Sequence, residues 1–298
     1  MIRLIARQGV LLLCVVAALT SFHGCGGGGG GNKADGGNRS GGGRARAITL
    51  KGSDTMVILG QKWAEVYMAS HPGSVIQVTG GGSGTGIAAL INGTTEIAQS
   101  SRTMKDTEKG QAEEKSGRKV EEHTVALDGV TVYVNNGNTV GTLSTGQLKG
   151  IYTGQITNWK EVGGSDMPIV VYGRESSSGT YVFFKEHVLG GADFAPQTQT
   201  LPGTAAVADA IGKDPKGIGY GGYAYGVGIK HVSVSKEDGG TAVEPSEATV
   251  RDGSYPLSRP LYWYTLSSPN PAAVEFLTWV MSAEGQKVVK DVGYFPIN

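Results

Sequence analysis

Residues 78–94 read VTGGGSGTGIAALINGT, in which a strand end is followed by small residues and then by apolar ones. The four residues Val75–Val78 predict a short strand, and the apolar positions within 87–91 predict a helix that ends at Gly93. A strand, a loop of small residues and a helix, in this order, form the repeating unit of α/β folds. This stretch therefore predicts an α/β domain with a glycine-rich loop between the strand and the helix.

The same order of elements recurs around two further loops. Residues 52–55 (GSDT) precede an amphipathic helical pattern from Met56 to Tyr67, and residues 173–180 (GRESSSGT) follow a predicted strand at Ile169–Tyr172. The other predicted elements are a strand at Gly129–Val134, a helix around Val182–Leu189 and one long helix from about Pro271 to about Val289. Strands that alternate with helices predict a mostly parallel sheet.

The three loops share a chemistry that suits an oxyanion. The first turn of a helix has backbone N–H groups without helical partners and a partial positive charge, while glycine lets a ligand approach and hydroxyls add donors. Ser, Thr and Asp before a helix are also ordinary N-caps, and any one of these loops alone is more often only that. Three such loops, one of them carrying the guanidinium of Arg174, favour convergence on one tetrahedral anion.

Other kinds of site have little support in the sequence. Lys213 follows Gly212 but precedes Asp214, so the glycine-rich motif of nucleotide hydrolases is not formed there. Thr85 stands where a nucleophile elbow around Ser83 would need glycine. The histidines lack the spacing of a metal site, and we expect neither a metal nor another cofactor.

The beginning of the chain has the pattern of an export signal. Two arginines within the first seven residues precede an apolar run at Val10–Leu19, too short to predict a membrane-spanning helix. We therefore expect a secretory signal peptide over residues 1–25. Cys25 resembles the lipid-modified cysteine of bacterial lipoproteins, although the bulky residues before Gly24 depart from the usual box; ordinary cleavage nearby is the alternative. The glycine-rich residues 26–46 predict a flexible tether.

Charge and cysteine content narrow the function classes. The chain has 26 basic and 26 acidic side chains, but residues 1–46 hold six of the basic and only one of the acidic ones. The remainder is mildly acidic, so an anion site there must depend on local donors, and nothing indicates a nucleic-acid partner. Both cysteines, Cys14 and Cys25, lie in the first segment, so no disulfide is expected in the folded part.

The chain resembles the phosphate-binding proteins of ABC phosphate importers, the PstS type, from Ile48 to Asn298. The stretches that carry the resemblance are KGSDTM (51–56), VTGGGSGTGIAALINGT (78–94), IAQSSR (97–102), VALDG (125–129), LKGIYTGQITNWKEVGG (148–164), YGRESSSGTYVFF (172–184), GIGYGGYAY (217–225) and YPLSRPLYWY (255–264). The resemblance implies a two-lobed, type II periplasmic-binding-protein fold, a Venus flytrap whose ligand lies in the cleft between two α/β lobes. It places residues 47–128 and 232–298 in lobe 1 and residues 129–231 in lobe 2.

The resemblance also implies a set of phosphate-binding residues. They are Ser53, Thr55, the N–H of Met56, Ser83 and Ser101 from lobe 1, and Arg174, Ser178, Gly179 and Thr180 from lobe 2. In one branch of the family, the residue at the position of Ser101 is an acid that accepts the proton of bound phosphate. Asp128, at the first lobe crossing, is our candidate for this acceptor, and capping of the hinge backbone is its alternative role.

Three other charged residues lie near the motifs. Asp54 is expected to cap the helix that follows it, and Glu175 to point outward beside Arg174. For Arg102, a second phosphate-binding charge and an ion pair at the edge of the cleft are equally good interpretations.

The function implied by the resemblance is high-affinity binding of inorganic phosphate and its delivery to the permease subunits of an ABC importer. We expect a monomer that is anchored through Cys25 to a membrane, in the periplasm or at the cell surface. The alternatives are another oxyanion such as sulfate or molybdate, a phosphate-ester hydrolase, and a surface protein for adhesion or sensing. No histidine or lysine lies in the loops to activate Ser83 or Ser178, which favours binding over catalysis.

Overall fold

The computed structural model describes residues 47–298. The predicted signal peptide, the predicted tether and Cys25 all lie outside the described residues. Within the described part of the chain, no helix has the length and apolar character needed to cross a membrane.

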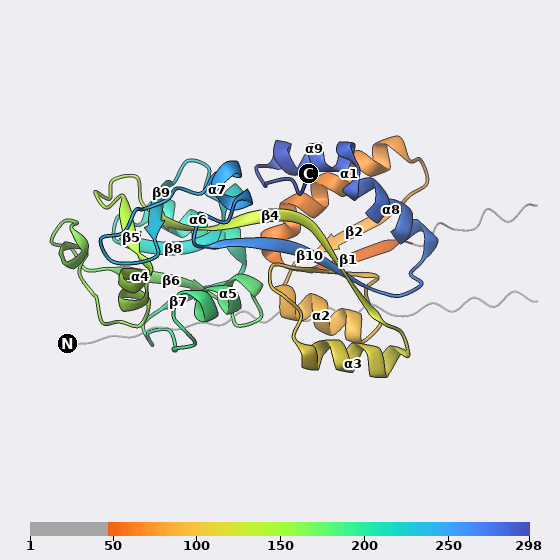
Figure 1. The fold of residues 1–298 in the computed structure, drawn as a ribbon, viewed down its shortest axis with the longest axis horizontal. Helices are drawn as coiled ribbons and strands as arrows, with labels where there is room; N and C mark the ends of the chain where they lie inside the picture. Colours follow the sequence, from red (N-terminus) through yellow and green to blue (C-terminus); the bar gives the residue numbers. More distant parts are fainter. Residues whose placement is uncertain (1–46) are drawn as a thin grey trace, which may run out of the picture. The chain divides into compact units, whose positions relative to one another are not determined.

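Lobe 1 is built around three parallel strands. They are β1 (Ile48–Gly52), β2 (Ile76–Thr79) and β3 (Ile97–Ser100), in the order β2-β1-β3. Its helices are η1 (Asp54–Met56), α1 (Val57–Ser70), α2 (Ser83–Ile91) and α3 (Asp106–Ser116), joined by α8 (Pro271–Met281) and α9 (Ala283–Val292). Figure 1 shows α1, α8 and α9 on one face of the strands and α2 and α3 on the other. β3 is buried along its whole length, as expected for a strand covered on both faces.

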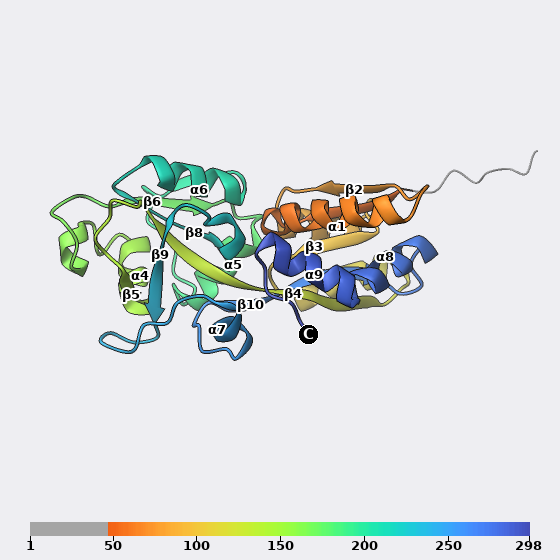
Figure 2. The same cartoon turned by 90° about the horizontal axis from the view of Figure 1, so that it is seen from above.

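Lobe 2 has the same layered construction. Its strands are β5 (Thr142–Ser144), β6 (Val170–Arg174), β7 (Gln199–Leu201), β8 (Gly217–Gly222) and β9 (Lys230–Ser235). Its helices are α4 (Thr145–Tyr152), η2 (Trp159–Val162), α5 (Gly179–His187), α6 (Gly203–Lys213) and η3 (Tyr223–Tyr225). The short helix α7 (Glu247–Arg251) follows β9 and packs through Val250 against the same core. β6 lies parallel to β7 and β8, and β5 lies parallel to β9. The helix α6 lies on one side of β6 and β8 (Figure 2).

Two long strands connect the lobes. β4 (Val120–Val134) and β10 (Ser258–Leu266) pair antiparallel from Ser258 opposite Gly129 to Leu266 opposite Val120. Within residues 47–298, every antiparallel pair of strands includes β4 or β10. The predicted parallel pairing therefore holds among the other strands of each lobe. β4 and β10 add the antiparallel pairs, with each other and also inside the lobes, where β4 pairs with β8 and β9 and β10 pairs with β3.

Each lobe has its own hydrophobic core. In lobe 1 the rings of Trp63 and Trp263 meet edge to face, with centroids 5.2 Å apart. In lobe 2 the rings of Phe184 and Tyr220 stack with centroids 4.1 Å apart. The two largest clusters of buried side chains thus lie in different lobes, which supports the two-lobed fold.

The position of the second lobe crossing remains a prediction. A crossing near His231, as the resemblance implies, separates side chains that pack together, because Val232, Val250 and Leu257 lie in the same cluster as Val130. This packing favours a return of the chain along β10, so that residues up to Leu257 accompany lobe 2.

The segment after α9 returns to the middle of the molecule. The Tyr294 hydroxyl, in a buried side chain, donates to the backbone carbonyl of Thr55. Leu127 and Phe295 exchange two backbone hydrogen bonds of 2.7 and 3.1 Å. Segments far apart in the sequence are thus joined at the loop after β1 and at β4.

The single long helix predicted from about Pro271 is wrong, because the structure has two helices that change direction at Ser282. Ser282 has an extended backbone (φ −73°, ψ 168°), and its side chain accepts the N–H of Gly285, so it caps α9. A Cβ on Gly285 would lie 2.4 Å from the carbonyl oxygens of Trp279 and Val280. Only glycine allows this close approach, while the apolar pattern continues across the break and conceals it.

Candidate functional site

The three small-residue loops converge at the junction of the lobes. Each follows a parallel strand (β1, β2 or β6) and leads into η1, α2 or α5, as predicted. The backbone N–H of Gly84, at the start of α2, donates to the carbonyl of Ser177, before α5 (3.0 Å). Gly82, with φ +92°, has no room for a side chain, because a Cβ would lie 2.5 Å from the same carbonyl oxygen. Glycine is therefore required for the lobes to approach this closely.

Six of the predicted hydroxyls form one buried group, which we call the hydroxyl cluster. Its members, each at most 2% exposed, are Ser53, Thr55, Ser83, Ser101, Ser178 and Thr180. Ser53 Oγ donates to Ser101 Oγ at 2.9 Å within lobe 1. Thr55 Oγ1 and Thr180 Oγ1, from opposite lobes, are also 2.9 Å apart. A Cβ on the fellow predicted ligand Gly179 would lie 2.3 Å from Ser83 Oγ, so both lobes pack directly onto the cluster.

The hydrogen bonds that Ser83 and Ser178 accept leave the protons of these two hydroxyls available to an anion. Ser83 Oγ accepts the N–H of Ser101 (3.0 Å), and Ser178 Oγ accepts the N–H groups of Thr180 (3.2 Å) and Tyr181 (3.3 Å). A hydroxyl that accepts from a fixed N–H still has its own proton to donate. The predicted ligand Met56 differs, because its N–H donates to the carbonyl of Ser53 (3.0 Å) within η1.

Arg174 brings a positive charge to the cluster from the end of β6. Its side chain is almost fully buried, and it donates from Nη1 to Thr204 Oγ1 (2.6 Å) and from Nη2 to Asp54 Oδ2 (2.7 Å). Its buried Nε has no hydrogen-bond partner among the described residues. Burial lowers the pKa of the guanidinium and Asp54 opposes that change, but an arginine stays charged at neutral pH. A buried charge with a spare donor suits a bound oxyanion.

The predicted role of Asp54 as a helix cap is wrong. Its carboxylate makes no capping bond to η1; Oδ1 accepts the N–H of Gly81 (2.7 Å) and Oδ2 pairs with Arg174. The Asp54 side chain therefore links all three loops. Glu175, by contrast, is exposed, as expected.

Asp128 lies near the cluster, but its carboxylate is engaged by an arginine that the sequence interpretation missed. Arg259 donates from Nε and Nη2 to Asp128 Oδ2 (3.1 and 2.8 Å), and the N–H of Tyr223 donates to Oδ1 (3.1 Å). Burial raises the pKa of the Asp128 carboxyl, and the charge of Arg259 partly offsets that rise. The role of Asp128 as an acceptor of the phosphate proton stays a prediction.

Arg259 could have been suspected, since it is the charged residue of the quoted stretch YPLSRPLYWY. No loop of small residues surrounds it, however, and its partner Asp128 is 131 residues away in the sequence. Only the pairing of β10 with β4 brings the two side chains together.

Arg102 takes part in an ion pair, which was one of its two predicted roles. Nη1 and Nη2 donate to the two carboxylate oxygens of Glu108 (2.8 and 2.7 Å). Burial acts to raise the pKa of Glu108, but hydrogen bonds from Arg102 and from the Lys105 N–H hold it below its ordinary value. Arg102 is thus tied to α3 at the edge of the cleft, while its buried Nε has no hydrogen-bond partner among the described residues. Its other predicted role, as a second phosphate-binding charge, stays a prediction.

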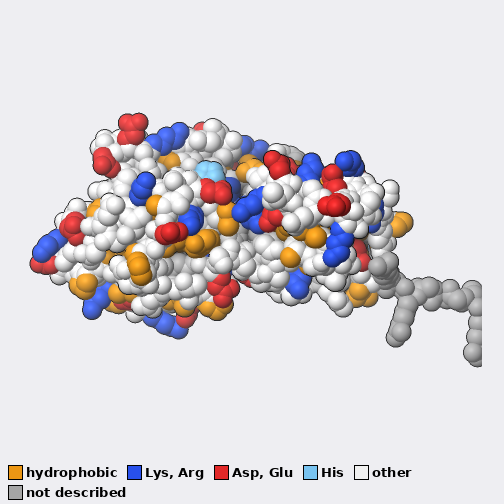
Figure 3. All heavy atoms as spheres, turned by 90° about the horizontal axis from the view of Figure 1, so that it is seen from below, with side chains coloured by type: hydrophobic (Ala, Val, Ile, Leu, Met, Phe, Trp, Pro, Cys, Tyr) orange, Lys and Arg blue, Asp and Glu red, His pale blue; other side chains and the backbone are white. Residues whose placement is uncertain are grey.

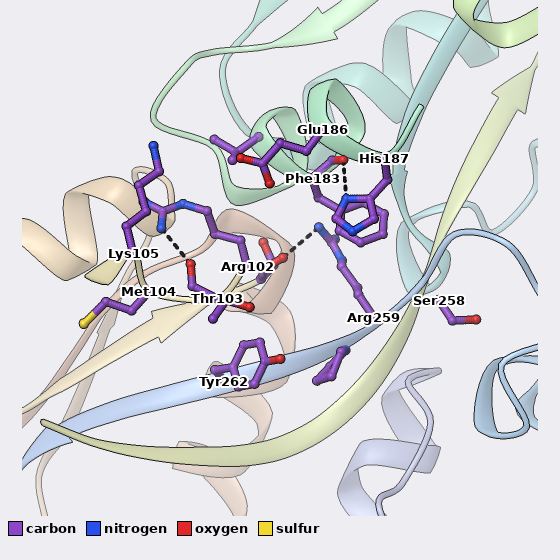
Figure 4. Close-up of a pocket in the computed structure, with 13 residues that line it drawn as sticks. Arg102, Thr103, Met104, Lys105, Phe183, Glu186, His187, Ser258, Arg259 and Tyr262 are labelled. Atoms are coloured by element: carbon purple, nitrogen blue, oxygen red, sulfur yellow. Dashed lines mark hydrogen bonds between the residues drawn. The ribbon is translucent and has the colours of Figure 1, made fainter. Parts of the chain in front are cut away.

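A cavity of about 310 Å³ adjoins the hydroxyl cluster, because it is lined by Ser101 of the cluster and by Arg259, which donates to Thr180 of the cluster. Figure 4 shows its three walls: Arg102 to Lys105 after β3, Phe183 to His187 on α5, and Ser258 to Tyr262 on β10. Both lobes and a crossing strand therefore meet at this cavity.

Beyond the cleft, charge is mixed. Figure 3 shows basic and acidic side chains interspersed over one face of the molecule, which agrees with the nearly balanced composition. Among residues 47–298, no group of His, Cys, Asp and Glu side chains is arranged to hold a metal ion. Attraction of an anion would therefore come from the loops themselves.

Comparison with known sequences shows extended similarity. The sequence pattern of the PBP superfamily domain matches residues 37–284. The phosphate-binding protein PstS of Pseudomonas aeruginosa is 36% identical over 263 residues, covering 83% of this chain and 81% of the relative. The protein of the same name from Staphylococcus haemolyticus is 37% identical over 254 residues, covering 82% and 79%.

Solved structures agree with this result. An ABC-type phosphate transport receptor from Vibrio cholerae matches with a TM-score of 0.68 and 30% identity, over 83% of this chain and 99% of that one. A structure from Clostridium perfringens with bound phosphate matches with a TM-score of 0.77 and 30% identity, over 85% and 100%.

Proposed function

Because the chain belongs to the PstS family of phosphate-binding proteins, within the PBP superfamily, we infer that it binds inorganic phosphate and delivers it to an ABC phosphate importer. The observation that carries this conclusion is the hydroxyl cluster beside Arg174, where donors from both lobes face one another in a buried setting. A phosphate there would accept hydrogen bonds from both lobes at once, so binding and lobe closure would stabilise each other.

We propose that Arg174 and the hydroxyls of the cluster are the direct ligands, together with backbone N–H groups at the start of α5, including Gly179. Arg174 supplies the charge, and its unpartnered Nε supports this role. Hydroxyls rotate to fit, so they can adjust to a tetrahedral anion without reorganising the backbone.

Selectivity for phosphate needs an acceptor as well as donors. Phosphate at neutral pH keeps a proton that sulfate lacks, so a carboxylate in the site attracts the first and repels the second. We propose Asp128 for this role; its carboxylate oxygens, although engaged by Arg259, have lone pairs to spare. Asp54 is another carboxylate near the cluster, so the tests below compare its substitution with that of Asp128.

The relatives are named as binding proteins and receptors of transporters. We propose that this chain is likewise a receptor without catalytic activity. A serine nucleophile would need a base, and the loops that carry Ser83 and Ser178 contain no histidine or lysine.

We also propose that the protein is exported, attached to a membrane through a lipid on Cys25, and works as a monomer that docks on the permease subunits. The basic and apolar residues before Gly24 and the glycine-rich residues 26–46 support this arrangement. A tether behind an anchored cysteine would let the two-lobed receptor reach its partner.

The deciding experiment is a calorimetric titration of the purified protein with phosphate, then with sulfate and molybdate, beside a phosphatase assay. We expect tight binding of phosphate, much weaker binding of the other anions and no hydrolysis of a chromogenic phosphate ester. Tighter binding of sulfate or molybdate would assign the protein to another oxyanion, and turnover of the ester would support the hydrolase alternative.

A further inference from the structure

Arg259 occupies the point where β10 enters the junction between the lobes. The side chain is almost fully buried, and it pairs with Asp128 on the other crossing strand. It also donates from Nη1 to the carbonyl of Ser101 in lobe 1 (3.0 Å) and from Nη2 to Thr180 Oγ1 in lobe 2 (3.1 Å). One guanidinium thus holds a crossing strand and one residue from each lobe.

A further contact fixes the guanidinium against lobe 2. Its central carbon lies 5.4 Å from the centre of the Phe183 ring, one turn after Thr180 on α5. Figure 4 shows Arg259 extending from β10 between the loop after β3 and α5, beside the cavity. Arg259 is therefore placed to respond to any movement of α5 relative to lobe 1.

The bond to Thr180 determines which way that hydroxyl donates. Arginine has donors and no acceptor, so Thr180 Oγ1 must accept from Arg259. The Thr180 proton is then directed elsewhere, toward Thr55 Oγ1 at 2.9 Å or toward an anion held in the cluster. Without Arg259, the same hydroxyl could rotate and present its lone pairs to the anion.

If Arg259 had a purely structural role, its ion pair with Asp128 would be enough. A buried Asp128 needs a positive partner, and a lysine could supply that charge. The planar fork of arginine adds the simultaneous bonds to Ser101 and Thr180, which a lysine cannot reproduce in this geometry.

We propose that Arg259 is a positioning residue for phosphate: it orients the Thr180 hydroxyl as a donor and ties that orientation to the closed arrangement of the lobes. This inference rests on the proposed binding of phosphate. It makes Arg259 a second arginine of the site, acting through Thr180, whereas Arg174 acts on the anion itself.

A double-mutant cycle tests the inference on the full-length protein. Phosphate affinity is measured by calorimetry for the wild type, for Arg259→Lys, for Thr180→Val and for the double variant. We expect Arg259→Lys to weaken binding about tenfold, as for a lost hydrogen bond to a charged ligand. In the Thr180→Val background the same change should weaken binding less than about twofold, because its target is gone.

Two further variants guard the interpretation. Thermal unfolding of Arg259→Met measures how much stability depends on the charge of Arg259, because without it Asp128 is left unpaired. Arg259→Lys keeps the charge, so its effect on phosphate binding is measured in a folded protein. Arg118→Met is the matched control. Arg118 donates to the carbonyls of Leu266 (3.0 Å), the last residue of β10, and of Ser268 (2.7 Å), two residues later, at the end of the strand away from Arg259. It should leave phosphate affinity unchanged.

The outcomes separate this inference from the proposed function. A wild-type protein that binds phosphate, with equal losses from Arg259→Lys in both backgrounds, would overturn the role of Arg259 alone. A wild-type protein that binds no phosphate would overturn the proposed function and this inference together.

Discussion

Nη2 of Arg174 lies 2.7 Å from Oδ2 of Asp54, so an ion pair joins the loop after β6 to the loop after β1 across the junction of the lobes. The Arg174 side chain is 2% exposed and that of Asp54 20% exposed, so water screens the pair only in part. Asp54 keeps the guanidinium in place, while Nε remains for another partner.

Replacing Arg174 with alanine should weaken phosphate binding by about 2–5 kcal/mol, because a desolvated anion loses its charged partner. Ser178→Ala should cost less, about 1–3 kcal/mol, since one donor to a charged group is lost. Calorimetry measures both. The surface variant Lys160→Ala, which breaks only an exposed pair with Asp166, is the control and should bind like the wild type. If both site variants bind phosphate like the wild type, residues other than Arg174 and Ser178 are the direct ligands.

Asp128→Asn should weaken phosphate binding and reduce the ratio of phosphate to sulfate affinity, because an amide can donate to sulfate and no longer repels it. The same ratio is measured for Asp54→Asn and for Asp209→Asn, whose carboxylate is exposed on α6. Asp209→Asn should change nothing. A ratio that falls only with Asp54→Asn would assign discrimination to Asp54 and leave Asp128 as the partner of Arg259.

Acidification should destabilise the fold through His231. Burial lowers its pKa from the ordinary value of 6.5, although the bond from Nε2 to the Gly226 carbonyl and the charge of Glu244 oppose this. A lowered pKa means that the unfolded chain takes up the proton first, so stability is complete above 6.5 and falls as pH drops below it. The free energy of unfolding in urea, compared between about pH 7.5 and about pH 5.5, should fall less in His231→Gln than in the wild type. An identical fall would assign the pH dependence to other groups.

Cys25→Ser should release the protein from membranes and leave its phosphate affinity unchanged, because Cys25 precedes the whole two-lobed domain in the sequence. Fractionation of cells into membrane and soluble material measures the release, and calorimetry measures the affinity. A wild-type protein found entirely in the soluble fraction, and cleaved at another residue, would disprove the anchor.

The sequence predicts the strand–loop–helix units of each lobe better than the long strands that connect the lobes. The strand–loop–helix units around residues 52–55, 80–86 and 173–180 occur as expected, because each is specified locally by apolar spacing and small residues. The predicted strand at Gly129–Val134 is only the end of β4. The start of β4, VEEHT at 120–124, is polar and partly exposed, and it is held in strand geometry by β10.

The site follows the same division. The hydroxyls and Arg174 were predicted, because they lie in the loops whose composition indicates anion binding. The pairings of Asp54 with Arg174 and of Asp128 with Arg259 were not, since each joins residues more than a hundred positions apart. The first forms where the two lobes meet, and the second forms through the pairing of β4 with β10. Buried charge pairs depend on tertiary contacts that no local pattern records.

The bond from Tyr294 to the carbonyl of Thr55 has a consequence for the order of folding. The two residues are 239 positions apart, and Thr55 belongs to the hydroxyl cluster. Contacts of such high sequence separation form late, because the intervening chain must first be available and ordered. During the proposed export, a chain threaded from its beginning could not fix the loop after β1 until Tyr294 had crossed the membrane. The receptor would then acquire its affinity for phosphate only outside the cell interior, after translocation is complete.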